Sequence, residues 1–386
     1  MIKVWDYLKE YEFLREEILD AVDQVFKGGT LIFGPKLQEF EEKFSKFNDC
    51  KYGIGVGNCT DAITIALRAC KVGIGDEVIT TSNTAVPTVT AIVNSGASVK
   101  FIDINEYSLM DVSKLANAIT EKTKAIVPVH LYGQMCEMNT IMELAKKNNL
   151  SVIEDCAQSH GATYFGKKAG SIGDIGCFSF YPTKIFGAYG DGGFISTNNE
   201  MLFDKMQRIR FLGMEKKKMS SGHWNGKYYA VEHGTNSRLD EVHAAILLKK
   251  LPYLNEWIDR RRVIAARYNK ELKDLNIELP IEHPDNRHAY YIYVVAHKDR
   301  DKIMKSLADK DIFLNISYPW PIHTMEAYKH FECGSCNCSR RLSKVADCNS
   351  LPETEISCKK IFSLPMYPTL TDSEQGIVIK ELKSLI

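Results

Sequence analysis

The sequence lacks a long apolar run and an excess of charge of one sign. No uninterrupted apolar stretch reaches the roughly 18 residues of a membrane span, and acidic residues interrupt the N-terminal segment MIKVWDYLKEYEFL where a signal peptide would be apolar. Lys and Arg (49) balance Asp and Glu (49), so the overall basic excess of nucleic-acid binders is missing. We therefore expect a cytoplasmic protein that binds neither nucleic acid nor membrane.

Cysteine is sparse for a chain of this length. Eleven cysteines among 386 residues are few compared with small secreted scaffolds, and an odd number cannot all pair within the chain. This indicates thiols in a reducing compartment. Five cysteines crowd one late segment and could ligate a structural zinc, but the spacing CGSCNC lacks the paired two-residue knuckles of common zinc modules, so we expect no metal. These five are Cys333, Cys336, Cys338, Cys348 and Cys358.

The composition is that of an ordinary globular protein, with 45% hydrophobic and 25% charged residues. From about residue 36 to 200, short β-branched runs alternate with helical patterns, which predicts a parallel sheet with helices on its faces. No repeat, low-complexity tract or Gly/Ser linker interrupts the chain, so we expect its parts to pack closely. The candidate strands are 52–57, 76–80, 99–103, 125–129, 151–155, 176–180 and 192–196.

Two segments carry clear helical patterns. In PKLQEFEEKFSKF the apolar residues Leu37, Phe40, Phe44 and Phe47 recur on one helix face, and Pro35 suits the first turn. After about residue 238 the helical patterns of apolar residues become longer. A strand-like run follows at 289–296. We expect a large domain over 1–250 and a smaller α+β domain over 251–386. The later apolar face comprises Leu254, Trp257, Ile258, Val263, Tyr268 and Leu272.

Ligands of open α/β sheets bind beyond the carboxyl ends of the strands, so the residues that follow each strand matter most. After the first candidate strand, Thr60 and Asp61 open a helix whose free amides could hold a phosphate. The same residues are also common helix caps. The phosphate hypothesis and the capping hypothesis are both open on this stretch alone.

Two further strand ends carry reactive side chains. Asp155 ends the run SVIED, with Gln158 and His160 close behind; its carboxylate could bind a metal, act as a base, hold a protonated ring nitrogen, or simply cap a turn. Lys184 follows the run GCFSFYPT and precedes a glycine-rich loop. A lysine among apolar residues has an easily depressed pKa, which suits Schiff-base chemistry, whereas a solvated loop lysine is the alternative.

Seven strings of this sequence occur in a characteristic order: GNCTDAI, SNTAVPTVTAI, PVHLYGQ, EDCAQSHGA, SFYPTK with GAYGDGG, GTNSRLDEVHAAI and SLPMYP. Together they resemble the nucleotide-sugar aminotransferases of the DegT/DnrJ/EryC1/StrS family, and the resemblance covers nearly the whole chain. It implies an α/β, aspartate aminotransferase-like fold (fold type I), with a mainly parallel seven-stranded sheet and a smaller α+β C-terminal domain. It also implies the cofactor pyridoxal 5'-phosphate.

The resemblance assigns roles to individual residues. Lys184 would be the internal-aldimine lysine and proton shuttle, Asp155 would pair with the pyridinium nitrogen, and Gln158 would lie against the ring and its hydroxyl. Asn236 would reach in from a second subunit, which implies a homodimer with shared active sites. Thr60, Asp61 and Ser179 would hold the cofactor phosphate.

The resemblance also implies a substrate. Lys184 is kept where a dehydratase branch has histidine, which favours transamination. Ala85 stands where a number of relatives place an aromatic ring that stacks on the cofactor, and enzymes acting on 3-keto sugars often share this feature. The expected reaction converts a dTDP-3-keto-6-deoxyhexose to its 3-amino sugar with L-glutamate, for surface glycans. Alternatives are a 4-keto sugar nucleotide or a non-catalytic sugar-nucleotide-binding regulator. Candidate substrate contacts are Arg238, Tyr318 and His323.

Overall fold

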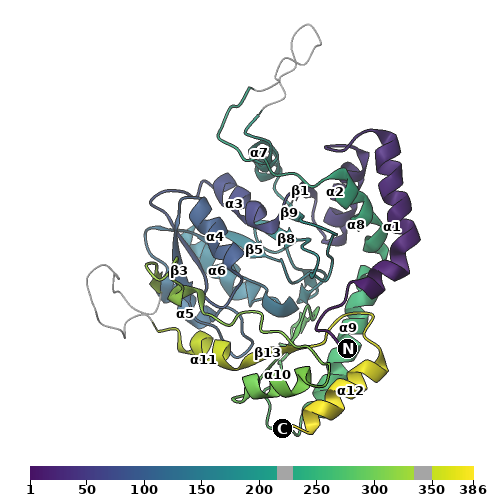
Figure 1. Cartoon of the computed structure of the whole chain (residues 1–386). Coiled ribbons are helices and arrows are strands. Elements are labelled where there is room, and N and C mark those ends of the chain that lie inside the picture. The colour runs from purple at the N-terminus through teal and green to yellow at the C-terminus, as the bar shows by residue number, and fades with distance from the viewer. Residues whose placement is uncertain (215–228, 334–349) are drawn as a thin grey trace.

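The computed structural model of the chain describes residues 1–214, 229–333 and 350–386. Its central sheet contains, in chain order, β1 (Tyr52–Val56), β2 (Glu77–Thr81), β3 (Ser98–Ile102), β4 (Thr123–Ile126), β5 (Ser151–Asp155), β8 (Ile175–Ser179), β9 (Gly193–Thr197) and β12 (Glu332–Cys333). In space the order is β1-β9-β8-β5-β4-β2-β3-β12. Figure 1 labels β1, β9, β8, β5 and β3 of this sheet. β9 is antiparallel to both of its neighbours, and the other pairs are parallel.

The mainly parallel seven-stranded sheet expected from the sequence is confirmed. All seven segments that were predicted as strands belong to this sheet. The two-residue strand β12 adds to its edge beside β3. A strand of two residues is too short to show an alternation of apolar and polar side chains, so no sequence pattern predicts it.

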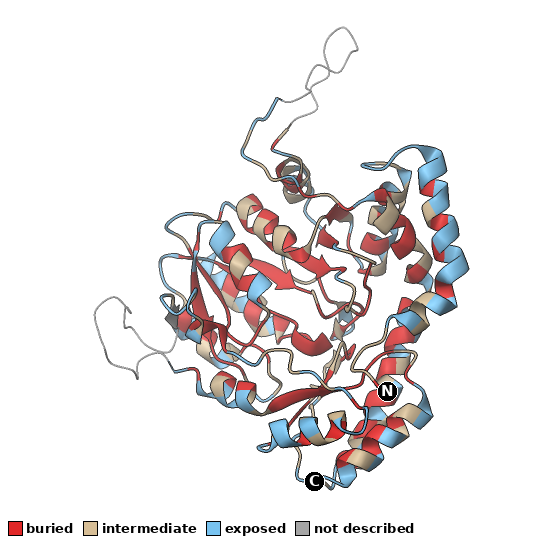
Figure 2. Ribbon diagram, in the orientation of Figure 1, coloured by how far each residue is buried: buried red, intermediate tan, exposed pale blue. Residues whose placement is uncertain are grey.

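Helices cover both faces of the sheet because its strands are apolar on both faces. Ile79 and Val152 lie in one hydrophobic cluster, whereas their neighbours Val78 and Ile153 lie in another. α2 (Pro35–Phe47), α5 (Val112–Ala118) and α6 (Met138–Asn148) cover the first cluster. α3 (Cys59–Ala69), α4 (Val86–Asn94) and α7 (Glu200–Arg210) cover the second. Figure 2 shows the strands buried between these two layers.

The helix predicted at 35–47 is confirmed as α2, with Pro35 in its first turn. Phe40 and Phe44 are fully buried. The N-cap residue of α2, Gly34, has no side chain that could accept the free amides of the first turn. Instead the carboxylate of Glu241, at the start of α8 (Glu241–Lys250), accepts the amides of Gly34, Lys36 and Leu37 at 2.8–2.9 Å. A residue about 200 positions away therefore caps α2.

The C-terminal part contains a third hydrophobic cluster. Its long helix α9 (Leu254–Leu272) buries Leu254, Trp257, Ile258, Tyr268 and Leu272 as predicted. Val263 was wrongly placed on this face, because it is 58% exposed. The remaining elements are α1 (Leu8–Gly28), α10 (Arg300–Ala308), α11 (Pro352–Lys360), α12 (Asp372–Lys383), and one-turn 3-10 helices at Leu131–Gly133, Leu251–Tyr253 and Ile322–Thr324.

The strand predicted at 289–296 is shorter than expected. Only β11 (Tyr293–Ala296) is a strand, and it pairs antiparallel with β13 (Ile361–Leu364). The preceding residues pair elsewhere: the amides of Ala289 and Tyr291 donate to the carbonyls of Gly133 and Tyr132. A positive φ of 48° at Tyr290 turns the chain between these two bonds. A small sheet of β6 (Thr163–Tyr164), β7 (Lys167–Lys168) and β10 (Asn286–Arg287) lies in another part of the fold.

The first residues of the chain pack against the C-terminal part (Figure 1). The Ile2 amide donates to the carbonyl of Asp311 at 2.7 Å, and the Met366 amide donates to that of Val4 at 3.2 Å. Ile2 also joins the third hydrophobic cluster. The division into domains at residue 250 stays a prediction.

Two side chains bind outward-facing main-chain groups of the edge strand β1. Glu41 accepts the amide of Gly55 at 2.8 Å, and Arg210 donates to the carbonyl of the same residue at 2.8 Å. Glu41 and Arg210 also pair with each other at 2.6 Å. These bonds occupy both outward main-chain groups of Gly55.

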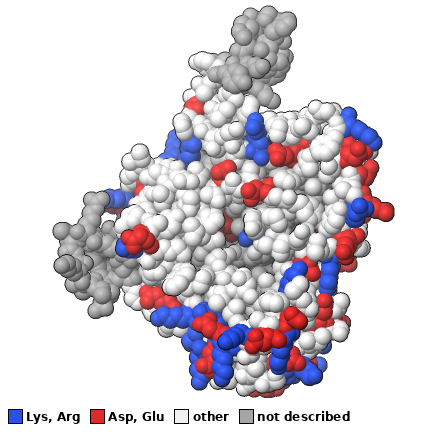
Figure 3. Space-filling model, in the orientation of Figure 1, with Lys and Arg blue, Asp and Glu red and all other residues white. Residues whose placement is uncertain are grey.

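The described surface agrees with the balanced composition. On the face shown in Figure 3, acidic and basic side chains mix over the C-terminal helices. Two ion pairs of these helices, Arg260–Asp372 and Lys383–Glu271, have distances of 2.8 Å. Within the described ranges, no helix combines the length and the apolar character needed to cross a membrane.

Candidate active site

A cavity of about 290 Å³ opens where the carboxyl ends of β5 and β8 meet the start of α3. Such an edge is where open α/β sheets bind ligands. The cavity brings together five of the residues singled out in the sequence, namely Thr60, Asp155, Gln158, Ser179 and Lys184. Its other lining residues include Thr84, Ala85, Thr88, Tyr181 and Asp191.

Asp155 is the last residue of β5 and is 4% exposed. Its Oδ2 accepts the Thr88 hydroxyl at 2.7 Å, and its Oδ1 accepts the Ala157 amide at 3.1 Å. Burial raises the pKa of the Asp155 carboxyl, while these two bonds and the Lys184 ammonium oppose the rise. A buried carboxylate held this way is suited to pair with a cationic ligand group.

Lys184 lies on the turn that follows β8. Its amide donates to the Tyr181 carbonyl at 2.9 Å, and its Nζ lies 4.6 Å from the centre of the Tyr291 ring. The turn is tight, because a Cβ at Gly187 would meet the Pro182 carbonyl oxygen at 2.5 Å. The half-buried Lys184 thus lines the cavity and places its amine against an aromatic ring, an arrangement that suits a Schiff-base lysine.

Gln158 is fixed at both ends of its carboxamide. Its Oε1 accepts the Tyr132 amide at 2.8 Å, and its Nε2 donates to the Tyr318 hydroxyl. The rings of Tyr132 and Tyr318 stack with centres 6.1 Å apart. Tyr318, predicted as a substrate contact, therefore lies next to the cavity through Gln158.

The start of α3 forms another wall of the cavity. The Asn58 side chain accepts the Asp61 amide at 2.8 Å, which leaves the amides of Cys59 and Thr60 without an acceptor in their own helix. A Cβ at Gly193 would lie 2.4 Å from the Asn58 carbonyl carbon, so only glycine lets β9 approach this closely. Free first-turn amides beside a cavity fit an anionic group such as a phosphate.

Asp61 itself is placed differently from what the sequence suggested. It does not line the cavity, its amide is already capped, and its Oδ2 accepts the Ser237 hydroxyl at 2.6 Å. A phosphate role for this position therefore depends on the helix start as a whole and not on the Asp61 carboxylate.

The segment around Ser237 carries two more predicted residues. Ser237 lies against the start of α3, but Asn236 is exposed and neither it nor Arg238 lines the cavity of this chain. The Arg238 guanidinium lies 6.0 Å from the Phe33 ring centre. The predicted reach of Asn236 into a second subunit stays a prediction.

The structure does not bring His323 into the cavity. Its side chain is 2% exposed, with Nδ1 2.7 Å from the Ser82 hydroxyl and Nε2 3.1 Å from Glu355. His160 is likewise buried outside the cavity, with its ring centre 5.5 Å from that of Phe178. Both histidines contribute to packing around the site and not to its lining.

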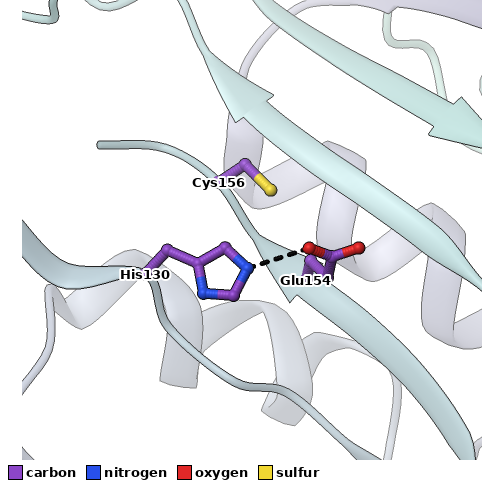
Figure 4. Close-up of side chains that lie close together, drawn as sticks. All are labelled: His130, Glu154 and Cys156. Atoms are coloured by element: carbon purple, nitrogen blue, oxygen red, sulfur yellow. Dashed lines mark hydrogen bonds and ion pairs between the residues drawn. The ribbon is translucent and has the colours of Figure 1, made fainter. Parts of the chain in front are cut away.

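A buried trio of His130, Glu154 and Cys156 lies next to Asp155 in the fold (Figure 4). Their potential ligand atoms are close enough for a metal, but they are already used. Glu154 accepts the His130 Nε2 at 2.9 Å and the amides of Gly170, Ile172 and Gly173, and His130 Nδ1 accepts the Cys136 amide. These bonds fill the acceptors of His130 and Glu154, so the two side chains belong to a hydrogen-bond network, and Cys156 lies beside it.

The cysteines whose side chains the structure describes are free thiols, as the sequence indicated; the side chain of Cys333 is not among them. Burial raises the pKa of the thiols of Cys59, Cys156 and Cys177, so these stay protonated. Of the late cysteines, Cys358 is free and buried, while Cys336, Cys338 and Cys348 lie outside the described residues.

Sequence reasoning missed Thr84, Thr88 and Tyr291 as parts of the site. The string SNTAVPT contains both threonines, and its position directly after β2 could have signalled them. Ala85 lines the cavity and offers no ring, whereas Tyr181, which follows β8 at the same edge of the sheet, is an aromatic residue of the lining. No pattern in the sequence links Tyr291 to Lys184.

A lysine, a buried carboxylate and a free helix start around one cavity at the carboxyl edge of such a sheet define a pyridoxal-phosphate enzyme of fold type I. These residues fit the cofactor: an amine for its aldehyde, a carboxylate for its ring nitrogen and amides for its phosphate. The chain belongs to the DegT/DnrJ/EryC1/StrS aminotransferase family, whose model matches residues 12–383. It is thus a sugar aminotransferase that uses pyridoxal 5'-phosphate.

Relatives and solved structures match over almost the full length. The chain is 45% identical over 390 residues to the dTDP-3-amino-3,4,6-trideoxy-alpha-D-glucose transaminase of Micromonospora megalomicea subsp. nigra, covering 99% of this chain and 98% of the relative. It is 41% identical over 368 residues to the dTDP-3-amino-3,6-dideoxy-alpha-D-galactopyranose transaminase of Aneurinibacillus thermoaerophilus, with 95% and 94% covered. The crystal structure of S. venezuelae DesV in complex with a ketimine intermediate matches with a TM-score of 0.90 and 33% identity, covering 100% of this chain and 98% of that one.

Proposed function

We propose that this enzyme transfers the amino group of L-glutamate to the keto carbon of a dTDP-linked 3-keto-6-deoxyhexose. The reaction takes place in the cytoplasm and gives a 3-amino sugar that is used for surface glycans. The observation that carries the proposal is the meeting of Lys184, Asp155 and the start of α3 around one cavity. The two relatives described above, which are transaminases of dTDP-3-amino sugars, support the choice of sugar.

The residues of this chain divide the work between binding and proton transfer. The first-turn amides of α3, Thr60 and Ser179 hold the phosphate, and Gln158 lies against the ring. The Asp155 carboxylate keeps the ring nitrogen protonated by charge. When bound, pyridoxal phosphate supplies an aldehyde carbon that accepts the amino group and a ring that withdraws electrons.

Lys184 performs the covalent and proton-transfer roles. Its amine would hold the cofactor, and the same amine, when free, would take the proton from the α-carbon of the donor. In the second half of the cycle it returns a proton to the sugar carbon that receives nitrogen. The Tyr291 ring, 4.6 Å from Nζ, excludes water from one side of this amine.

We further propose a homodimer in which Asn236 of one subunit completes the other subunit's phosphate site. Support comes from its exposure and from Ser237, which ties the same segment to the start of α3. A two-fold axis would repeat this contact in both sites. Arg238 is the proposed partner of the donor's carboxylate, because its planar fork binds both oxygens.

A substrate panel tests the proposal. The purified enzyme is mixed with L-glutamate and with 3-keto or 4-keto 6-deoxyhexoses carrying dTDP or UDP, each prepared in situ, and 2-oxoglutarate is measured. We expect the dTDP-3-keto sugar to react at least about tenfold faster, a difference of about 1.4 kcal/mol in transition-state binding. Faster turnover of a 4-keto or UDP sugar would overturn the assignment.

The control for the panel is Lys184→Ala. This variant should keep a native circular dichroism spectrum and should give no 2-oxoglutarate, because only the covalent and proton-transfer roles are lost. Ordinary turnover by this variant would show that another residue carries the reaction.

A further inference from the structure

A chain of hydroxyl groups reaches the carboxylate of Asp155 from α4. Thr88 Oγ1 donates to Asp155 Oδ2 at 2.7 Å, and Thr84 Oγ1 lies 3.1 Å from Thr88 Oγ1. All three residues are at least 96% buried and line the cavity. The two threonines therefore lie beside the carboxylate in the wall of the cavity and not in bulk solvent.

The direction of these bonds follows from the count of hydrogens. An ionised carboxylate only accepts, and each hydroxyl has one hydrogen to donate. The hydrogen of Thr88 therefore goes to Asp155, and the hydrogen between the two threonines comes from Thr84. Each bond polarises the next, which strengthens the one that ends on the charged oxygen.

We propose that Thr84 and Thr88 form a positioning relay that keeps Asp155 ionised and fixes the plane of its carboxylate toward the cofactor's ring nitrogen. The inference rests on the proposed role of Asp155 and deepens it. The Ala157 amide at 3.1 Å holds the other oxygen, so two donors from two elements set the rotation of the group. Each carboxylate oxygen keeps a further lone pair for a ligand in the cavity.

The electrostatics of the site agree with this role. Burial raises the pKa of the Asp155 carboxyl, and the Thr88 hydroxyl, the Ala157 amide and the Lys184 ammonium all lower it. Loss of the Thr88 hydroxyl would make Asp155 a stronger base. A proton shared between Asp155 and the ring nitrogen would then move toward the carboxylate, and the ring would withdraw electrons less well.

The test compares Thr88→Val, which has nearly the same shape without the hydroxyl, with Thr88→Ser, which keeps the donor. Thr90→Val is the matched control, because Thr90 lies on the same helix but bonds the Tyr328 hydroxyl. The holoenzyme is loaded with pyridoxal phosphate labelled with ¹⁵N in the ring, and the nitrogen's chemical shift reports its protonation. The kcat, the KM for glutamate and the cofactor dissociation constant are measured alongside.

We expect Thr88→Val to move the ¹⁵N shift toward the unprotonated value and to lower kcat by about tenfold, with KM within about twofold, since the lost bond is to a charged group. Thr88→Ser should restore both readouts, and Thr90→Val should match wild type. An unchanged ¹⁵N shift in Thr88→Val would overturn the relay. If that variant does not fold, Thr84→Val takes its place: an intermediate ¹⁵N shift is expected, and no change refutes the relay.

Asp155→Asn in the same series separates the two proposals. If Asp155→Asn is slow and Thr88→Val is not, the relay is wrong and the role of Asp155 stands. If Asp155→Asn itself keeps the wild-type rate and ¹⁵N shift, the proposed role of Asp155 is what fails.

Discussion

The buried His160 should make the protein sensitive to mild acid. Its ring is fully buried and makes no well-aligned hydrogen bond to a described residue, although the nearby Ser179 main chain offsets a small part of the effect of burial. Burial, together with the nearby Lys184 charge, lowers the pKa of His160 from 6.5 to about 3. The folded protein therefore keeps this imidazole neutral where the unfolded chain protonates it.

The sign and size of the effect follow from this difference. Below pH 6.5 the unfolded state binds a proton that the folded state does not, so stability is lost as the pH falls and is regained as it rises. Between pH 7.5 and 5.5 the loss is about 1.4 kcal/mol for one such histidine. His288, whose pKa burial also lowers to about 3, should contribute a similar loss.

The assay is urea unfolding of wild type and of His160→Leu at pH 7.5 and pH 5.5. The measured quantity is the loss of unfolding free energy between the two pH values, so a packing cost common to both cancels. The variant should lose about 1.4 kcal/mol less than wild type over this interval. His288→Asn, which keeps an acceptor for the Tyr290 amide, is the matched second variant. Equal losses in wild type and His160→Leu would refute a neutral His160.

Two further predictions concern the catalytic unit. Asp155→Asn should bind the cofactor yet lose more than about tenfold in kcat, because an amide cannot hold a ring nitrogen protonated by charge; steady-state rates within twofold of wild type would contradict this. Lys184→Ala and Asn236→Asp, each inactive alone, should recover about a quarter of wild-type activity when mixed and reassembled, because one site of each heterodimer carries both lesions and the other carries none. An active monomer on size exclusion would disprove the shared site.

The sequence allowed most of the sheet to be predicted, because its strands are short apolar runs between helices of regular period. The segment 151–155 was placed without error, and α2 was found from the spacing of its phenylalanines. The run 289–296 was wrongly predicted to be a strand over its whole length, because its tyrosines and other apolar residues favour a strand. Its first half instead forms hydrogen bonds to the loop at Gly133. Val263 shows the same limit: spacing alone cannot tell which residues at the border of a helix face remain exposed.

The site was predictable where a strand end places a residue directly. Asp155 ends one buried strand and Lys184 follows another, so topology alone brings them to one edge. The role of Thr88 was not predicted, because its partner Asp155 is 67 positions away in the sequence and Thr88 itself lies in a helix. The sequence did not predict that the Asp61 amide is already capped, because a helix cap and a phosphate site use the same residue types.

The closed edge of β1 bears on how two copies can meet. An edge strand with vacant main-chain groups invites another strand to continue the sheet, in productive pairing or in aggregation. At Gly55 both outward groups are already bound by Glu41 and Arg210, which are themselves paired at 2.6 Å. An incoming strand would have to break a largely buried ion pair before gaining its first hydrogen bond there. In the proposed homodimer we therefore expect β1 not to pair with a strand of the other subunit, and the single chain is protected from stacking into continuous sheets along this edge.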